Sequence, residues 1–109
     1  MNIFVTSQDP LISAQALDDK RVIKMILESA QLMCTAINLA GGVSPYKSTH
    51  RNHPCAIWAR STKANYWWLF KHWLALCDTY FERFGKRHKT LEHMNVLMEG
   101  MGIMPSTVD

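Results

Sequence analysis

Residues 49 to 68 hold the densest group of side chains able to recognise a polar, planar ligand. These twenty residues include two histidines, two arginines, two asparagines and three tryptophans. Histidine, asparagine and arginine supply directional hydrogen bonds or positive charge, while an indole supplies a flat surface on which a base or sugar can stack. We therefore expect a nucleotide or a nucleic acid to bind here. The expected contacts are made by His50, Asn52, His53, Trp58, Arg60, Asn65 and Trp68.

A second polar group precedes this segment and has the spacing of one helix face. Its members, separated by four, four and three residues, are Lys20, Lys24, Glu28 and Gln31. The pattern is also typical of an ordinary solvent face, on which Lys24 would pair with Glu28. The charged cluster at residues 18–21 favours a binding role, because a helix N-terminus attracts anions such as phosphate. The expected contacts with the nucleic acid or nucleotide are Asp19, Lys20, Arg21 and Lys24.

Metal binding is the less favoured interpretation of His50 and His53. With Cys55 they have side chains that ligate metals, yet their spacing matches no standard zinc motif and a fourth ligand is missing. We predict no metal site and no cofactor. His53 can equally cap a short helix that begins at Pro54.

Start and stop signals predict helices along the first half of the chain. Asp9 followed by Pro10 begins a helix of about two turns, because aspartate caps free amides and proline needs no donor at the first position. Asp18 or Asp19 caps a longer helix, which ends near Ala40 before two glycines.

The second half of the chain carries the same signals. Pro54 opens a short helix to about Arg60. Ser61 or Thr62 then caps a helix that continues to Phe84, where a glycine ends it. The apolar stripe of that helix predicts a buried face of Tyr66, Leu69, Phe70, Trp73, Cys77, Tyr80, Phe81 and Phe84.

The remaining stretches are short or lack helix signals. Residues 2–6 form a short extended segment, residues 41–51 a loop, and residues 91–98 one last helix. We therefore predict an all-α protein, a compact helical bundle with a short extended N-terminal segment. Residues 1–100 form a single helical domain and residues 101–109 a flexible tail.

Composition and charge limit the class of protein further. The chain of 109 residues is 48% hydrophobic and 19% charged, which is typical of a globular domain. A net charge of +3 permits an anionic partner but is below the basic excess of a protein that coats DNA. A basic cluster around Gly85, which includes Arg83, is interpreted as a solvated turn. Three cysteines without CxxC spacing indicate reduced thiols.

The sequence also bears on location. Charged residues interrupt the apolar stretches before the roughly 20 residues needed to span a bilayer, and the N-terminus has no signal-peptide pattern. We expect a cytoplasmic protein without membrane contact, and association into a homo-oligomer stays open.

Two blocks of the sequence resemble a known family. Residues 18–32 and residues 52–69, which include Asn52-His53-Pro54-Cys55-Ala56-Ile57-Trp58-Ala59-Arg60 and Asn65-Tyr66-Trp67-Trp68-Leu69, are similar to small, largely phage-encoded proteins. These proteins are labelled pyrimidine-dimer DNA glycosylases of the endonuclease V type. The resemblance covers roughly residues 1–85, and a phage origin would place the protein in the host cytoplasm.

The resemblance implies a chemistry and assigns residues to it. In such glycosylases the N-terminal α-amine attacks a sugar carbon to form an imine, a glutamate on an early helix assists, and basic residues hold kinked DNA. An α-amine with a pKa of about 8 is partly unprotonated at neutral pH. The resemblance therefore places the reactive end at Met1 or Asn2 and makes Glu28 the assisting carboxylate. Because Asn2 is too large for routine removal of Met1, we expect the reactive α-amine to be that of Met1.

Three functional hypotheses follow. The leading one is a DNA glycosylase and abasic lyase, involved in DNA repair, that acts on a damaged or modified base extruded from the helix. The alternative is a non-catalytic phage protein that binds or sequesters a nucleotide or nucleotide-derived signal and so counters a host defence. The third is a protein-interaction module whose tryptophans form a hot spot.

Overall fold

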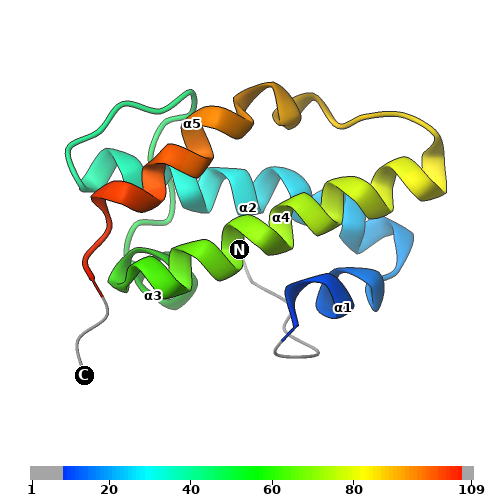
Figure 1. Cartoon of the computed structure of the whole chain (residues 1–109), viewed down its shortest axis with the longest axis horizontal. Helices are drawn as coiled ribbons and strands as arrows, with labels where there is room; N and C mark the ends of the chain where they lie inside the picture. The colour runs from blue at the N-terminus through cyan, green and yellow to red at the C-terminus, as the bar shows by residue number, and fades with distance from the viewer. Residues whose placement is uncertain (1–8, 107–109) are drawn as a thin grey trace.

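The computed structural model describes residues 9–106, and these form helices and loops without any strand (Figure 1). The all-α prediction is therefore confirmed, whereas the extended segment expected at residues 2–6 lies outside the described residues. The elements in chain order are α1 Pro10–Gln15, α2 Asp19–Leu39, α3 Pro54–Ser61, α4 Lys63–Phe84, the 3-10 helix η1 Lys89–His93, α5 Met94–Glu99 and the 3-10 helix η2 Gly100–Ile103.

The helices begin at side chains that cap them. Asp9 accepts a hydrogen bond from the amide of Leu11 at 2.9 Å and starts α1. Asp18 caps α2, and Thr62 caps α4 by accepting from the amide of Asn65 at 3.1 Å. Each cap satisfies an amide that has no partner within its own helix, so these short-range signals set the helix starts as the sequence predicts.

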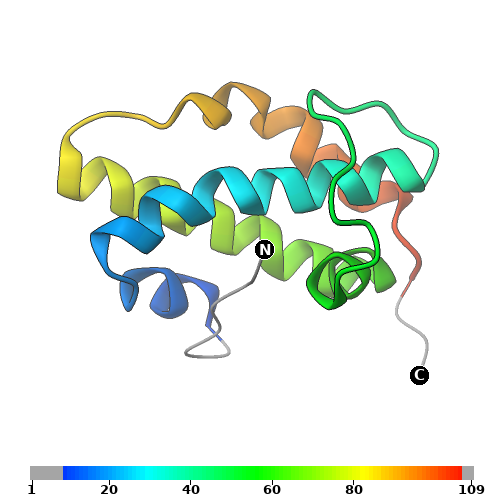
Figure 2. The ribbon, with the colours of Figure 1, turned by 180° about the vertical axis from the view of Figure 1, so that it is seen from behind.

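Two long helices, α2 and α4, run side by side in opposite directions and form the centre of the bundle (Figures 1 and 2). α1 and α3 lie along one edge of this pair, and α5 lies along the other. The core between them is made by the fully buried Ile26 and Leu32 of α2 and by Leu69 and Trp73 of α4. This packing fixes the relative positions of the polar residues on α2, α3 and α4.

One end of the α4 stripe does not match the prediction. Tyr66 to Cys77 are buried as expected, but Phe81 is 46% exposed and Phe84 is 37% exposed. The last turns of α4 extend past the neighbouring helices (Figure 1). There Phe81 lies under the guanidinium of Arg87, 5.2 Å from the ring centre, and Phe84 packs against Tyr80.

Residues 101–106, predicted as part of a tail, have helical structure and contacts with the start of α4. η2 continues to Ile103, and Met104 is only 3% exposed. The ammonium of Lys63 donates to the carbonyls of Gly102 at 2.9 Å and Met104 at 2.8 Å, and the Lys63 amide donates to Pro105 at 2.7 Å. These contacts bind the segment to the start of α4, and residues 107–109 lie outside the described part of the chain.

α2 has the length and hydropathy of a membrane-spanning helix, but 61% of the relevant window is buried within the bundle. Burial of this kind is typical of a central core helix, in which an apolar face packs against other helices. The hydropathy of α2 is therefore accounted for by its place in the core.

Candidate functional site

The polar face of α2 passes from solvent toward the loop that precedes α3. Lys20 and Lys24 are exposed, whereas Glu28 and Gln31 are half-buried. Within residues 9–106 no ion pair joins Lys24 to Glu28, so the pairing predicted for a solvent face is wrong. The two lysines instead line a depression of about 320 Å³, together with Asp18 and Arg21.

Glu28 is the unusual member of this face. Its Oε2 atom is buried and, among the residues described, no group donates a hydrogen bond to it. A buried carboxylate oxygen without a donor costs free energy, and such atoms are rare in folded proteins. Glu28 thus keeps one buried acceptor atom, Oε2, that has no hydrogen-bond donor within the described residues.

Two other charged residues of the predicted site have structural contacts. Asp19 accepts a hydrogen bond from Arg83 at 3.0 Å, and the same guanidinium donates to the carbonyls of Leu17 at 2.8 Å and Gln15 at 3.1 Å. Arg83 therefore links α4 to the α1–α2 junction, a contact that the interpretation as a solvated turn did not include, although the residue is exposed. Arg21 forms an ion pair with Asp18 at 3.1 Å and stays largely exposed.

The loop before α3 is attached directly to the polar face of α2. The amide of Thr49 donates to Oγ1 of Thr35 at 3.1 Å, and Thr35 lies one helical turn after Gln31. His50 follows with a φ of +49°, a conformation that non-glycine residues seldom adopt. The structure thus brings the two polar groups of the sequence together. The exposed His50 and Asn52 follow the point at which the loop is attached to the polar face of α2.

His53 caps a helix, and this hydrogen bond also determines which ring nitrogen carries the proton. Its Nδ1 accepts a hydrogen bond from the amide of Cys55 at 3.1 Å, which makes His53 the N-cap of α3. Because Nδ1 is an acceptor, the proton of the neutral ring lies on Nε2. The alternative prediction of a helix cap is confirmed, but the ring accepts from an amide where a bond to a backbone carbonyl was expected. Nε2 keeps a donor for a ligand.

Aromatic rings connect α3 to α4. Trp58 and Trp68 meet edge to face with ring centres 6.0 Å apart, and Asn65 donates to the carbonyl of Trp58 at 2.9 Å. Asn65 therefore holds α3 in place. Trp67, on the adjacent position, stacks on Phe70 and points elsewhere.

His72 belongs to the same group and was not predicted. Its ring stacks on Trp68 with centres 4.9 Å apart, and its Nδ1 lies 2.9 Å from the carbonyl oxygen of Pro10. A carbonyl only accepts, so Nδ1 carries the proton and Nε2 is the acceptor. Burial lowers the pKa of His72 and favours the neutral ring. His72 follows Trp68 by four residues, one helical turn, and this spacing is the sequence pattern that could have indicated the contact between the two rings.

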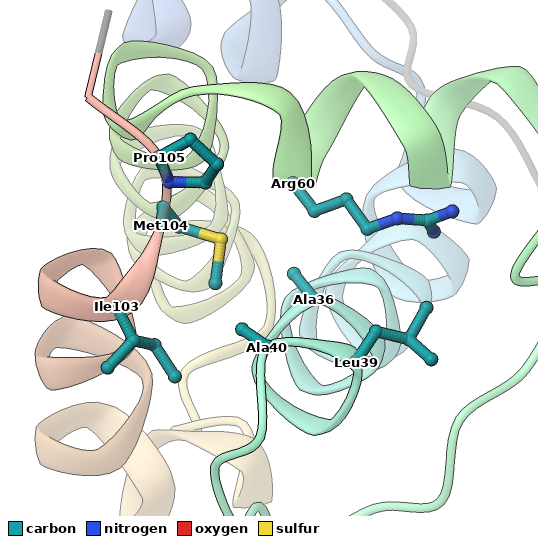
Figure 3. Close-up of a pocket in the computed structure, with 7 residues that line it drawn as sticks. All are labelled: Ala36, Leu39, Ala40, Arg60, Ile103, Met104 and Pro105. Carbon is teal, nitrogen blue, oxygen red and sulfur yellow. The ribbon is translucent and has the colours of Figure 1, made fainter.

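Arg60 lies apart from the lysines of α2. Its guanidinium donates to the carbonyl of Arg51 at 2.7 Å. Its side chain borders a separate depression of about 350 Å³ between the end of α2 and the C-terminal segment (Figure 3). The other residues that line it are Ala36, Leu39, Ala40, Ile103, Met104 and Pro105. The predicted binding residues therefore divide between two places.

Comparison with known proteins identifies the family. The family model for pyrimidine dimer DNA glycosylases matches residues 1–93. The chain belongs to the pyrimidine dimer DNA glycosylase family. Neither the search of curated proteins nor the search of solved structures found a match.

The pyrimidine dimer DNA glycosylase match includes every residue predicted for the site, and its name indicates a DNA substrate. The predicted reactive residues Met1 and Asn2 are inside the match but outside the described residues. α5 and η2 follow the match, and the buried Tyr66 hydroxyl donates to the carbonyl of Leu97 to hold α5 on α4.

Proposed function

We propose that this protein is a DNA glycosylase and abasic lyase acting on a damaged or modified base in duplex DNA. The observation that carries the proposal is the buried, unpartnered Oε2 of Glu28, on the helix face that also presents Lys20 and Lys24. Family membership supports the reaction class. A carboxylate on the same helix face as two cations suits a site at which a sugar becomes positively charged next to backbone phosphates.

The proposed reaction begins with the free N-terminal α-amine. Its nitrogen bonds to C1′ of the sugar, the bond from C1′ to the base breaks, and the base leaves with a proton. The resulting imine permits loss of a proton from C2′ and departure of the 3′ phosphate, after which water releases the sugar. Glu28 stabilises the positive charge on the sugar and accepts the C2′ proton.

The remaining residues of the site bind the DNA. Lys20 and Lys24 contact phosphate, with Arg21 at the edge of the same depression. The extruded base lies near Trp58 and Trp68, where an indole provides a stacking surface. The Nε2–H of His53 and the amide of Asn52 supply hydrogen bonds to the base or its sugar.

A single-turnover assay on duplexes with an abasic site or a pyrimidine dimer tests the proposal. Glu28→Gln keeps the size of the side chain but removes its charge, so strand cleavage slows by about 100-fold or more. Glu99→Gln, at an exposed position of α5, is the matched control and keeps the wild-type rate. Cleavage by Glu28→Gln at the wild-type rate would contradict the role given to Glu28.

A second candidate function is binding of a nucleotide or nucleotide-derived signal without turnover. The depression lined by Lys20, Arg21 and Lys24 favours it, because about 320 Å³ suits a small anionic ligand. A panel of mono-, di- and cyclic nucleotides separates the candidates. The second function is supported, and the first excluded, if a nucleotide raises the melting temperature of the protein and the protein neither binds nor cleaves abasic duplex.

A further inference from the structure

The short helix α3 exposes its large apolar side chains and buries its small ones. Ile57 is 45% exposed and Trp58 is 37% exposed, whereas Ala56 and Ala59 are buried. A surface helix of a soluble protein normally has the opposite arrangement, with its large apolar residues in the core. The two alanines join the core between α3 and its neighbours, so the packing of α3 does not use Ile57.

The segment that contains α3 carries positive charge and no negative charge. Between Glu28 and Asp78 the sequence has no aspartate or glutamate, but it has five lysines and arginines. One of these cations, Arg51, is exposed in the turn before α3. An apolar face among cations, without a carboxylate in the segment, complements a polyanion that also offers apolar surface, as the stacked bases of a nucleic acid do.

Comparable exposed apolar residues elsewhere lie beside carboxylates. Ile12 of α1 comes one turn after the cap Asp9, and its amide lies 3.4 Å from the carboxylate of that cap. Met98 of α5 directly precedes the exposed Glu99. A carboxylate repels the phosphates of a nucleic acid. The charge of its surroundings therefore distinguishes the apolar face of α3 from these two.

α3 is fixed at both of its ends. His53 caps its first turn, and the side-chain amide of Asn65 donates to the carbonyl of Trp58 at 2.9 Å. At its last turn, the guanidinium of Arg60 donates to the carbonyl of Arg51 at 2.7 Å. A side chain that is pushed between stacked bases needs such a support, because otherwise the helix moves and the bases stay stacked.

We propose that Ile57 is a wedge that enters the base stack of duplex DNA and fills the space left by the extruded base. The inference rests on the proposed function, which requires a base to leave the helix. Extrusion costs stacking energy, and apolar side chains such as isoleucine, inserted between bases, offset part of that cost. The edge of Trp58 meets Trp68, so Ile57 is the more exposed of the two adjacent residues.

Single-turnover cleavage of two duplexes, one with a pyrimidine dimer and one with an abasic site, tests the wedge. The abasic duplex has already lost the stacking of its target, so it needs the wedge less. Ile57→Ala removes the wedge, and Ile57→Leu keeps an apolar side chain of the same size. Ile12→Ala is the matched control, because Ile12 is 53% exposed and lies beside a carboxylate.

Two further measurements accompany the rates. Each protein is titrated with dimer duplex that carries 2-aminopurine beside the lesion, whose fluorescence rises when the bases around it unstack. The melting temperature of each protein is also recorded, and it stays close to the wild-type value because both substituted positions are on the surface.

The proposal expects Ile57→Ala to cleave the dimer duplex at least about tenfold more slowly, and to cleave the abasic duplex within about threefold of the wild-type rate. The rise in 2-aminopurine fluorescence seen with the wild type is lost in Ile57→Ala. Ile57→Leu recovers most of the rate and of the fluorescence rise, and Ile12→Ala matches the wild type.

The opposing outcomes are distinct. Wild-type rates of Ile57→Ala on the dimer duplex overturn the wedge, leave the proposed function intact and direct attention to a protein partner for this face. Equal losses on both duplexes also overturn it, because they describe a residue that supports binding or folding alone.

The wild-type protein decides the remaining cases. If it cleaves only the abasic duplex, the fluorescence decides, and a rise that is absent or that persists in Ile57→Ala overturns the wedge. A wild-type protein that cleaves neither duplex overturns the proposed function, and this inference fails with it.

Discussion

The backbone amide of Thr49 donates to the hydroxyl of Thr35, and this contact fixes the polar loop against α2 one turn beyond Gln31. Thr35 is fully buried and Thr49 is half-buried. Asn38 and Ser44 attach the earlier part of the loop to α2, and the bond between Thr35 and Thr49 is the one next to His50.

Thr35→Val removes this hydroxyl and keeps the shape of the side chain. The Thr49 amide is then left without its acceptor, which lowers the free energy of unfolding by about 1–3 kcal/mol. Urea unfolding measures the loss, and the cleavage rate falls as the loop moves away from α2. Thr79→Val, at a similarly buried position of α4, is the control, and equal effects of the two changes would contradict this account.

Glu28→Gln is expected to make the protein more stable while it removes activity. The wild-type side chain keeps a carboxylate oxygen buried without a donor, and a neutral amide is less costly to bury there. We expect the free energy of unfolding to rise by about 1 kcal/mol. Chemical denaturation beside Glu99→Gln tests this, and a clear loss of stability would mean that Glu28 supports the fold.

Lys24→Gln is expected to weaken the salt dependence of DNA binding. A lysine that contacts one phosphate releases about one counterion, so the slope of log K against log salt falls by about 1. Titrations of a fluorescent abasic duplex at several salt concentrations measure the slope. Lys86→Gln, in the exposed turn after α4, serves as the comparison, and identical slopes for both variants would place the DNA elsewhere.

Gly100→Ala tests whether the segment that follows α5 is packed. A methyl group at Gly100 would lie 2.5 Å from the Tyr66 hydroxyl and 2.7 Å from Ile37, so the core must shift. We expect a loss of about 1–3 kcal/mol in the free energy of unfolding. At Gly102→Ala the added methyl group meets no atom within 4 Å, so this control should leave the free energy of unfolding nearly unchanged. Equal free energies of unfolding for the two variants would contradict the packing of this segment.

Local patterns explain what the sequence predicted correctly. Asp9, Asp18 and Thr62 act on amides two or three residues away, so their caps are visible in the sequence. The burial of Tyr66 and Trp73 follows from helical periodicity in the same way.

Contacts between distant segments explain what the sequence did not predict. Lys63 reaches carbonyls about forty residues later, and Arg83 reaches carbonyls more than sixty residues earlier. Backbone carbonyls are present at every residue, so no pattern indicates which of them a cation will reach. His72 was missed for the same reason, because its partner is the carbonyl of Pro10.

The site was partly predictable. The two polar groups are evident in the sequence, but they are brought together by bonds between distant residues, among them the bond between Thr35 and Thr49. The unpartnered state of Glu28 and the separate position of Arg60 follow from packing, which a spacing of residues along one helix does not contain.

Borohydride trapping tests the central claim most directly. The purified protein, with Met1 confirmed and unblocked, is mixed with abasic or UV-irradiated duplex and reduced, so that an imine becomes a stable amine. Intact mass and peptide mapping then locate the adduct. The account predicts a covalent sugar adduct on the N-terminal amine, and the absence of an adduct, or an adduct confined to a lysine side chain, would contradict it.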